Sequence, residues 1–384
     1  MFEEIGIYGW EEAEVTVLSA IMADLPILFI GRHGANKTDG ARQIAKAIWG
    51  PKVKFTSFHC PLLTTEDLLG WPDPSSLKKG KMGFIDTGNS VWNCEVALWD
   101  EINRANQMVG SKILEIVRTK RVMDRPTALR FSFSAINPPK EYESAYMSQA
   151  LASRFVCIRV PDADTMSDVG SVLKKLRKRK KVRRRSSRLR NLITRALEYE
   201  VDEKNQKAID DLLIVLHESS THYISIRSLE MIRRLVVANL QLSSIGIPLT
   251  TVNVVNSVLG AIPEFFEITR SKKEADIVFS VQAAVNSYLT RVDLPENMIS
   301  PPPSDPAEWG YSIVKEAENH PERCLRLYKE VKNKEEDGSI DPEVSKAVRG
   351  GIWLAAARRD TAFMESPFSL ESLDTTRNVF VIEP

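Results

Sequence analysis

The sequence predicts a parallel α/β core followed by helices, and three observations support this prediction. Short apolar runs alternate with helical patterns over the first 160 residues, which is typical of strands joined by crossover helices. Most of these runs lead directly into glycine or polar residues, as buried strands do when they carry functional groups at their carboxyl ends. After Pro161 the apolar residues recur at helical spacing. We therefore expect an α/β core with a parallel sheet, an α-helical lid and a mostly helical C-terminal extension.

Five apolar runs are the candidate strands of the sheet. They are Ile27–Ile30, Val53–Phe58, Val96–Trp99, Phe131–Ile136 and Phe155–Val160. Helical patterns lie between them at Asp39–Trp49 and Met108–Arg118. A stretch rich in glycine and lysine, Leu77–Gly88, interrupts the alternation and predicts a hairpin or loop insertion.

The pattern divides the chain into three predicted domains. Residues 1–160 form the core, residues 161–270 the helical lid, and residues 271–384 the extension, with a proline-rich linker near 294–306. The extension is expected to dock on the core or on a partner. Helices of the lid and the extension are predicted at Lys204–His217, Ser228–Leu242, Thr251–Leu259 and Lys273–Val292.

The composition places the chain among ordinary globular proteins. Of its 384 residues, 43% are hydrophobic and 27% are charged, which excludes wholesale disorder. Its apolar runs are far shorter than a membrane-spanning helix, and acids stand near the N-terminus where a secretory signal carries bases. The four cysteines are scattered and form no C-x-x-C pair. We expect a cytoplasmic protein that does not enter a membrane.

The positive charge is concentrated in one segment. Lys174–Arg190 holds twelve lysines and arginines and no acid. Because the net charge of the whole chain is +1, the rest of the chain has a net charge of −11. Like charges at this density repel one another unless a polyanion neutralises them, so contact with nucleic-acid phosphates is one interpretation. The other is a loop that docks on an acidic protein. No aromatic residue is interleaved, so base stacking by this run is not expected.

The segment after the first strand has the pattern of a phosphate-binding loop. An apolar strand runs into Gly31, a loop follows with Lys37 and Thr38 at its end, and an amphipathic helix begins there. Backbone N–H groups, the helix dipole and a lysine together bind polyphosphate, and the hydroxyl beside the lysine completes a Mg²⁺ shell. A surface turn before a helix is the alternative. The residues expected to bind nucleotide are Gly31, Gly34, Ala35, Asn36, Lys37, Thr38 and Asp39.

The strict pattern G-x-x-x-x-G-K-[ST] is not met in this loop. Asn36 stands where the second glycine belongs. Asparagine is the non-glycine residue that best tolerates a positive φ, so we expect the loop to close nevertheless.

A pair of acids at the end of a later strand gives a second signal. Val96–Trp99 leads directly into Asp100 and Glu101. In this position Asp100 can order Mg²⁺, and Glu101 can polarise an attacking water. Together with the upstream Lys-Thr pair, the acids predict a site for a polyphosphate and Mg²⁺.

Several motifs in order make the chain similar to the MoxR-like AAA+ ATPases over roughly Val17 to Phe266. The string Asp100–Ala105 resembles the DEINRA signature of that family. Further similar segments are Glu66–Gly70, Asp86–Gly88, Phe133–Pro138, Gln149–Phe155, Ile224–Arg227 and Pro248–Val254.

The resemblance implies a role for each residue of the nucleotide site. Lys37 would bind the β- and γ-phosphates, while Thr38 and Asp100 would hold Mg²⁺. Glu101 would orient the hydrolytic water, and Asn137 would sense the γ-phosphate.

The resemblance also implies two arginines from other segments. Arg227 would act from the lid within the same subunit, and Arg154 would reach the nucleotide of a neighbouring subunit in a ring that is mostly hexameric. Departures from the family pattern are Asn36 and the pair Arg32-His33, which replaces two prolines.

Three functions follow from these observations. The first is a chaperone-like ATPase ring that remodels or assembles protein complexes, for which the resemblance implies an adaptor with a von Willebrand factor A domain. The second is a nucleic-acid-linked motor or a component of a defence or mobile-element system, which would use Lys174–Arg190. The third is a nucleotide-stabilised structural ring with little turnover, motivated by Asn36.

Overall fold

The computed structural model describes residues 1–139, 145–161, 186–219, 224–247, 249–269, 275–289, 291–292, 313–314, 316–318, 320–336, 340 and 342–368. The chain forms two compact units. The larger comprises Met1–Ile247 and Asn253–Val292, and the smaller comprises Pro248–Val252 and Asp293–Pro384. The predicted division at residues 160 and 270 stays a prediction.

A five-stranded parallel sheet is the centre of the larger unit. The strands are β1 (Ile27–Ile30), β2 (Phe55–His59), β5 (Val96–Asp100), β8 (Phe131–Ile136) and β9 (Val156–Arg159). Their order in space is β2-β5-β8-β1-β9, and every neighbouring pair is parallel. The strands confirm the five predicted runs to within two residues. Because all five run in the same direction, the loops after them meet at one edge of the sheet.

The sheet is buried on both faces, which is why its strands are apolar without alternation. In β1 all four side chains are buried. Phe29 faces Trp10 and Phe133, with ring centroids 5.1 and 5.6 Å away. Leu28 points to the other face and belongs to a second cluster that includes Trp99.

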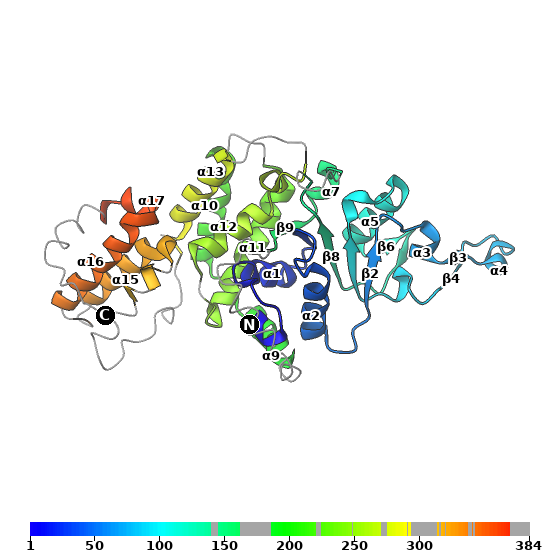
Figure 1. Ribbon diagram of the computed structural model, residues 1–384, viewed down its shortest axis with the longest axis horizontal. Helices are drawn as coiled ribbons and strands as arrows, with labels where there is room; N and C mark the ends of the chain where they lie inside the picture. Colours follow the sequence, from blue (N-terminus) through cyan, green and yellow to red (C-terminus); the bar gives the residue numbers. More distant parts are fainter. Residues whose placement is uncertain are drawn as a thin grey trace. The chain divides into compact units, whose positions relative to one another are not determined.

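Two long helices cover the faces of the sheet (Figure 1). Helix α2 (Lys37–Trp49) contacts β2, β5 and β8, and helix α5 (Gln107–Thr119) belongs to the cluster that contains Leu28. Both helices confirm the predicted patterns. Helix α1 (Glu11–Met22), which precedes β1, was not predicted.

Short elements fill the connections. Helix α3 (Thr65–Leu69) leads into a hairpin of β3 (Trp71–Pro72) and β4 (Phe84–Ile85), with α4 (Pro74–Leu77) between the two strands. This hairpin confirms the predicted insertion. The remaining short elements are η1 (Phe2–Ile5), η2 (Val91–Asn93), η3 (Ile102–Arg104), β6 (Arg121–Val122), β7 (Arg125–Pro126), α7 (Gln149–Ala152) and η5 (Pro263–Phe266).

Helices follow the sheet, as predicted. They are α9 (Ser186–Leu197), α10 (Glu203–Ser219), α11 (Ile226–Ser244), α12 (Thr251–Gly260) and α13 (Ala275–Leu289). A buried polar network joins α1 to α11 and α12. Ser19 Oγ donates to Asn239 Oδ1 at 2.8 Å, and Asn239 Nδ2 donates to Ser257 Oγ at 2.9 Å. A fully bonded buried network of this kind fixes how the helices pack.

Most of the basic run lies outside the described residues. Residues 174–185 are not described, and the last five residues of the run begin α9. There Arg190 Nε donates to the carbonyl of Ile48, near the end of α2, at 2.6 Å. The proline-rich linker near 294–306 also lies outside the described residues.

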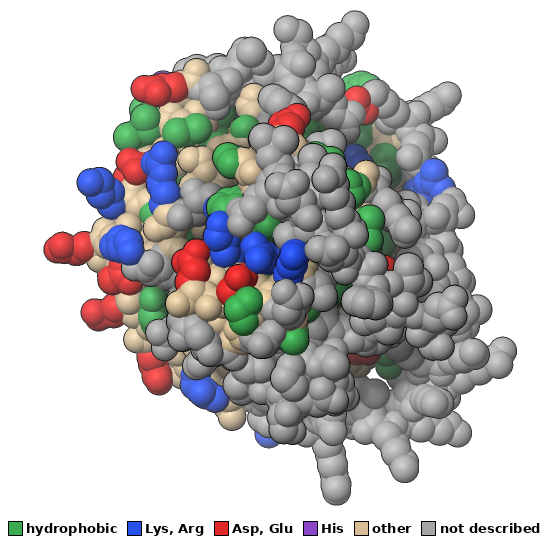
Figure 2. Space-filling model, turned by 90° about the vertical axis from the view of Figure 1, so that its left-hand side faces the viewer, with side chains coloured by type: hydrophobic (Ala, Val, Ile, Leu, Met, Phe, Trp, Pro, Cys, Tyr) green, Lys and Arg blue, Asp and Glu red, His purple; other side chains and the backbone are tan. Residues whose placement is uncertain are grey.

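The smaller unit has a helical core of its own. Helices α15 (Cys324–Glu336), α16 (Pro342–Arg359) and α17 (Thr361–Met364) follow η7 (Pro321–Arg323). Tyr328 and Phe363 are both fully buried in this core, with ring centroids 5.5 Å apart. Figure 2 shows lysine and arginine side chains gathered beside carboxylates on one face. Among the helices that the structure describes, none combines the length and apolar character of a membrane span.

Candidate functional site

The loop between β1 and α2 has the curled backbone that the sequence predicts. Gly34 has φ +84°, and Asn36 has φ 59° and ψ 25°, which is the left-handed region. Helix α2 begins at the next residue, Lys37. The expectation that Asn36 closes the loop in place of glycine is confirmed. The loop therefore presents the first N–H groups of α2 at the edge where the strands end, an arrangement that favours an anion.

The neighbouring strand end leaves little room for a side chain where this loop begins. A Cβ atom at Gly31 would lie 3.1 Å from the carbonyl oxygen of Val160 and 3.3 Å from its Cβ. The Gly31 N–H donates to the carbonyl of Ile136 at 3.3 Å. The start of the loop is therefore held between the ends of β8 and β9.

The side chain of Lys37 folds back over the loop. Its Nζ donates to the carbonyls of Gly31 and Arg32 at 2.5 and 2.9 Å, and to Asn137 Oδ1 at 3.0 Å. Burial lowers the pKa of Lys37, while the nearby carboxylates of Asp100 and Glu101 act in the opposite direction. The ammonium group is thus the positive charge at the centre of the site.

The two acids after β5 occupy the neighbouring strand end. Glu101 has φ 51°, again in the left-handed region, and its side chain is only 12% exposed. Arg104 Nη1 lies 3.2 Å from Glu101 Oε2, and His33 Nε2 lies 3.9 Å from Glu101 Oε1. A non-glycine residue held at positive φ is characteristic of functional sites, because the backbone conformation is costly.

Asn137 connects the lysine to the acid. It follows β8 directly and is buried. Its Nδ2 donates to Glu101 Oε1 at 3.3 Å, while its Oδ1 accepts from Lys37. Three residues that the sequence predicted for one site, from three different loops, are therefore joined by hydrogen bonds.

Thr38 and Asp100 supply oxygen atoms that suit a hard cation. Thr38 lies half-buried in the first turn of α2, and Asp100 ends β5. The described residues hold no cluster of three or more His, Cys, Asp or Glu side chains arranged for a metal. One carboxylate and one hydroxyl fit Mg²⁺ only when substrate phosphates supply further ligands. Asp39, the other polar residue of this turn, is exposed and pairs with Arg42 at 3.0 Å.

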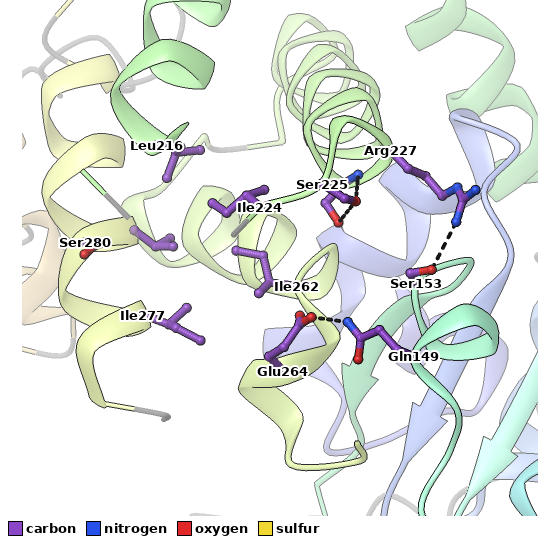
Figure 3. Close-up of a pocket in the computed structure, with 12 residues that line it drawn as sticks. Gln149, Ser153, Leu216, Ile224, Ser225, Arg227, Ile262, Glu264, Ile277 and Ser280 are labelled. Atoms are coloured by element: carbon purple, nitrogen blue, oxygen red, sulfur yellow. Dashed lines mark hydrogen bonds between the residues drawn. The ribbon is translucent and has the colours of Figure 1, made fainter. Parts of the chain in front are cut away.

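Arg154 and Arg227 lie together at a second place. Arg227 lies in the first turn of α11, and its Nη1 donates to Ser153 Oγ at 3.2 Å, as Figure 3 shows. Burial lowers the pKa of Arg154, and the positive charges of Arg227 and Arg118 lower it further. No contact of Arg227 within the described residues reaches Lys37, Asp100, Glu101 or Asn137. The structure thus joins Arg227 to Arg154 and not to the loop.

A cavity of about 170 Å³ lies beside these arginines. Figure 3 shows Arg227 and Ser153 on one side of it, and a hydrogen bond from Gln149 to Glu264 on another. The apolar side chains that line the cavity come from α10, from α13 and from the segments beside α11 and η5; they are Leu216, Ile224, Ile262, Ile277 and Val281.

The strand order brings the predicted segments to one edge of the sheet. In the sheet β1 lies between β8 and β9, the phosphate-loop pattern follows β1, two acids follow β5, and helices follow β9. The larger unit is an α/β core with a parallel five-stranded sheet and helices that follow it.

Two solved structures are similar to this chain. A candidate ATPase from Cytophaga hutchinsonii has a TM-score of 0.45 and 18% identity, over 76% of this chain and 93% of the other. An MCM homolog from Methanopyrus kandleri has a TM-score of 0.43 and 13% identity; the match covers 76% of this chain and 58% of the other. No model of a known family and no curated protein matches the sequence.

The structure adds residues to the candidate site that the sequence did not single out. Arg104 pairs with Glu101, and Arg118 lies near Arg154. Arg104 stands inside the acidic motif, so its spacing of three residues from Glu101 was a usable signal. Arg118 is distant in sequence from the other arginines, and no pattern pointed to it.

Proposed function

We propose that this protein is an ATPase that hydrolyses ATP with Mg²⁺ at the loop after β1. The observation that carries the proposal is the hydrogen-bonded chain from Lys37 through Asn137 to Glu101. It brings a cation, a polar amide and a carboxylate to one edge of the sheet. Phosphoryl transfer to water requires positioning and charge stabilisation, and this set of groups supplies both.

The loop and Lys37 would bind the triphosphate. N–H groups of the loop and of the first turn of α2 face the phosphates, and Lys37 moves its ammonium group from the loop carbonyls to the phosphate oxygens. Thr38 and Asp100 would hold Mg²⁺, which neutralises phosphate charge when bound.

Glu101 and Asn137 would act on the attacking water. Glu101 accepts a hydrogen bond from the water and then its proton as the oxygen attacks the γ-phosphorus, and ADP leaves. Asn137 would exchange its bond to Lys37 for one to the γ-phosphate. The same side chain contacts Glu101, so it would report the presence of ATP to the catalytic acid.

Arg154 and Arg227 would act on the ATP of a neighbouring subunit. Two guanidinium groups held close together repel each other unless an anion lies between them, which supports a phosphate as their partner. Because Arg227 bonds to the segment that carries Arg154, we propose that both arginines serve the same phosphate. The site is then complete only in a ring, and the resemblance to the MoxR group supports a hexamer.

The work done by the ring would be the remodelling or assembly of protein complexes. The MoxR resemblance supports this role and an adaptor with a von Willebrand factor A domain. A nucleic-acid-linked motor remains the alternative, supported by the charge of Lys174–Arg190.

Steady-state ATP hydrolysis by the wild type and by Glu101→Gln tests the proposal. We expect turnover to fall by about 100-fold or more in the variant, while ATP is still bound. Glu218→Gln, an exposed carboxamide exchange on α10, is the matched control and should keep wild-type turnover. Equal turnover in the wild type and Glu101→Gln would contradict the assignment of the catalytic acid.

The same assay separates the alternatives. Stimulation by mixed nucleic acid that fades as salt rises would favour the motor. ATP-dependent oligomers with negligible turnover would favour a structural ring.

A further inference from the structure

The hairpin that follows α3 is a folded arm with an unusual surface. We define the arm as Gly70–Asp86. Trp71 pairs with Ile85 and Pro72 with Phe84 in an antiparallel register. Figure 1 shows the arm extending beyond α3, away from the sheet. A Cβ at Gly70 would lie 2.1 Å from the carbonyl oxygen of Ile85, so the base of the arm closes only with glycine there.

The two acids of the arm are engaged inside it. Asp73 caps α4 by accepting from the N–H groups of Ser75 and Ser76 and from both serine hydroxyls. These hydrogen bonds lower the pKa of Asp73 to about 2. Asp86 accepts from Ser90 Oγ at 2.5 Å and from the Gly88 N–H at 2.9 Å. Both carboxylates stay negatively charged, but within the described residues neither forms an ion pair with a lysine of the arm.

One face of the arm is apolar and open. Trp71 and Ile85 stand directly opposite each other, so their side chains share a face, and they are 62% and 52% exposed. Phe84 points to the other face, where its ring lies 5.8 Å from that of Trp92. Leu77 and Met82, near the tip, are each 50% exposed. Four large apolar side chains exposed on one short element are typical of a protein-binding surface.

Three lysines accompany the apolar side chains. Lys78, Lys79 and Lys81 are exposed at the tip, and no ion pair or hydrogen bond engages their ammonium groups in the described residues. The arm thus combines an apolar face with three lysines at its tip whose ammonium groups form no ion pair within the described residues, against two carboxylates engaged in hydrogen bonds. A partner that matches it must bring apolar side chains and carboxylates together.

We propose that the arm, Gly70–Asp86, binds an acidic protein segment that carries large apolar side chains. The apolar residues would contact Trp71 and Ile85, and the acids would pair with the lysines at the tip. Nucleic acid matches the surface less well, because only one of the four exposed apolar side chains is aromatic and able to stack on a base. The inference does not depend on ATP hydrolysis, since the arm contributes no residue to the nucleotide site.

Binding of a labelled synthetic peptide to the full chain tests this inference. The probe is a peptide of alternating glutamate with leucine and phenylalanine, and the comparison peptide has lysine in place of glutamate. We expect the acidic peptide to bind at least about tenfold more tightly than the basic one. Trp71 is the exposed tryptophan of the described residues, so bound peptide should also shield it from quenching by iodide.

Two paired variants locate the binding. Each of two double variants should lower the affinity for the acidic peptide by about tenfold or more. The first is Trp71→Ser/Ile85→Ser, and the second is Lys78→Glu/Lys79→Glu. The controls are Met123→Ser, an exposed apolar residue elsewhere, and Lys52→Glu/Lys207→Glu, two exposed lysines elsewhere. Circular dichroism verifies that all variants are folded.

Two outcomes would overturn the inference. One is wild-type affinity for the acidic peptide in both arm variants. The other is a single-stranded oligothymidylate that binds more tightly than the peptide and loses its binding in the arm variants, because the arm would then be a nucleic-acid site.

Discussion

At the scale of single residues, the candidate site depends on two non-glycine residues in the left-handed region. Asn36 at φ 59° turns the loop into α2, and Glu101 at φ 51° turns the chain after β5. The left-handed conformation costs roughly 1–2 kcal/mol for most residues, and least for glycine and asparagine. Glu101 therefore stands at a backbone position whose cost the surrounding structure must offset, whereas Asn36 adopts its position at little cost.

Replacement of Asn36 tests the role of its backbone. Asn36→Gly should leave the free energy of unfolding within about 0.5 kcal/mol of the wild type and keep ATP binding, because glycine adopts the same φ freely. Asn36→Val should lower that free energy by roughly 1–2 kcal/mol and weaken the binding of ATP, because a β-branched residue does not tolerate the left-handed conformation. Urea unfolding and a fluorescent ATP analogue measure the two effects, and equal behaviour of both variants would contradict the strained-loop interpretation.

The protonation of Lys37 gives a prediction about pH. Burial lowers the pKa of Lys37 in the free protein, so its ammonium charge is lost at a lower pH than that of an ordinary lysine. Affinity for ATP should be constant below this pKa and fall as pH rises through it. Titrations of ATP binding at rising alkaline pH measure the effect. Lys37→Arg keeps its charge at these pH values, so a fall of equal steepness in that variant would assign the effect to another group.

At the scale of elements, apolar runs and periodicity predicted the strands and most helices. The runs at Ile27–Ile30 and Phe131–Ile136 agree with β1 and β8 to the residue, because strands buried on both faces are bounded by polar residues. Helix α1 was not predicted, because eight of its twelve residues are buried. Its apolar residues are therefore not confined to one face, and the helix lacks a clear amphipathic pattern. Lys37, Asn137 and Glu101 were predicted to belong to one site. The hydrogen bonds that join Lys37 and Glu101 through Asn137 could not be predicted, because they depend on the order of the strands in the sheet.

Two glycines at equivalent positions of α2 and α5 test how Trp10 packs against α2. Gly40 and Gly110 are each the fourth residue of a thirteen-residue helix, α2 and α5. A Cβ at Gly40 would lie 2.7 Å from the ring of Trp10, whereas one at Gly110 would meet nothing nearer than 4.0 Å. Gly40→Ala should lower the free energy of unfolding by about 1–3 kcal/mol, because the added methyl group meets the Trp10 ring. Gly110→Ala should raise the free energy of unfolding by about 0.5–1 kcal/mol, because alanine favours the helix and meets no neighbour.

Thermal or urea unfolding of the two variants measures this difference. Stabilisation by Gly40→Ala would show that Trp10 does not pack against the first turn of α2. Since that turn contains Thr38, we also expect Gly40→Ala to lower the affinity for ATP, whereas Gly110→Ala should leave this affinity unchanged.

At the scale of the whole molecule, the chain carries two cores that differ in composition and role. The larger unit holds the candidate nucleotide site, and the smaller unit has its own cluster around Tyr328, Ile352 and Phe363. Composition and the proline-rich linker indicated a helical extension, but its core residues were not predicted, because periodicity alone does not say which helices pack together. Two cores imply that the units can lose stability separately.

A change in the smaller core tests this separation. Ile352→Ala, at a fully buried position of α16, should lower the unfolding free energy of the smaller unit by about 2–5 kcal/mol. Leu354→Ala on the same helix is the control, because Leu354 is 45% exposed and should change it by no more than about 0.5 kcal/mol. ATP affinity should be unchanged in both, and a parallel loss of ATP binding in Ile352→Ala would contradict independent units.

The central claim is an ATPase site completed by the Arg154 of a neighbouring subunit, and mixing two inactive variants tests it most directly. Glu101→Gln keeps Arg154, and Arg154→Ala keeps Glu101, so each alone should be inactive. In a randomly mixed ring about a quarter of the interfaces join an intact Glu101 to an intact Arg154. The account predicts that ATP hydrolysis returns on mixing, in proportion to those interfaces. Mixtures that assemble but stay inactive at every ratio would contradict it.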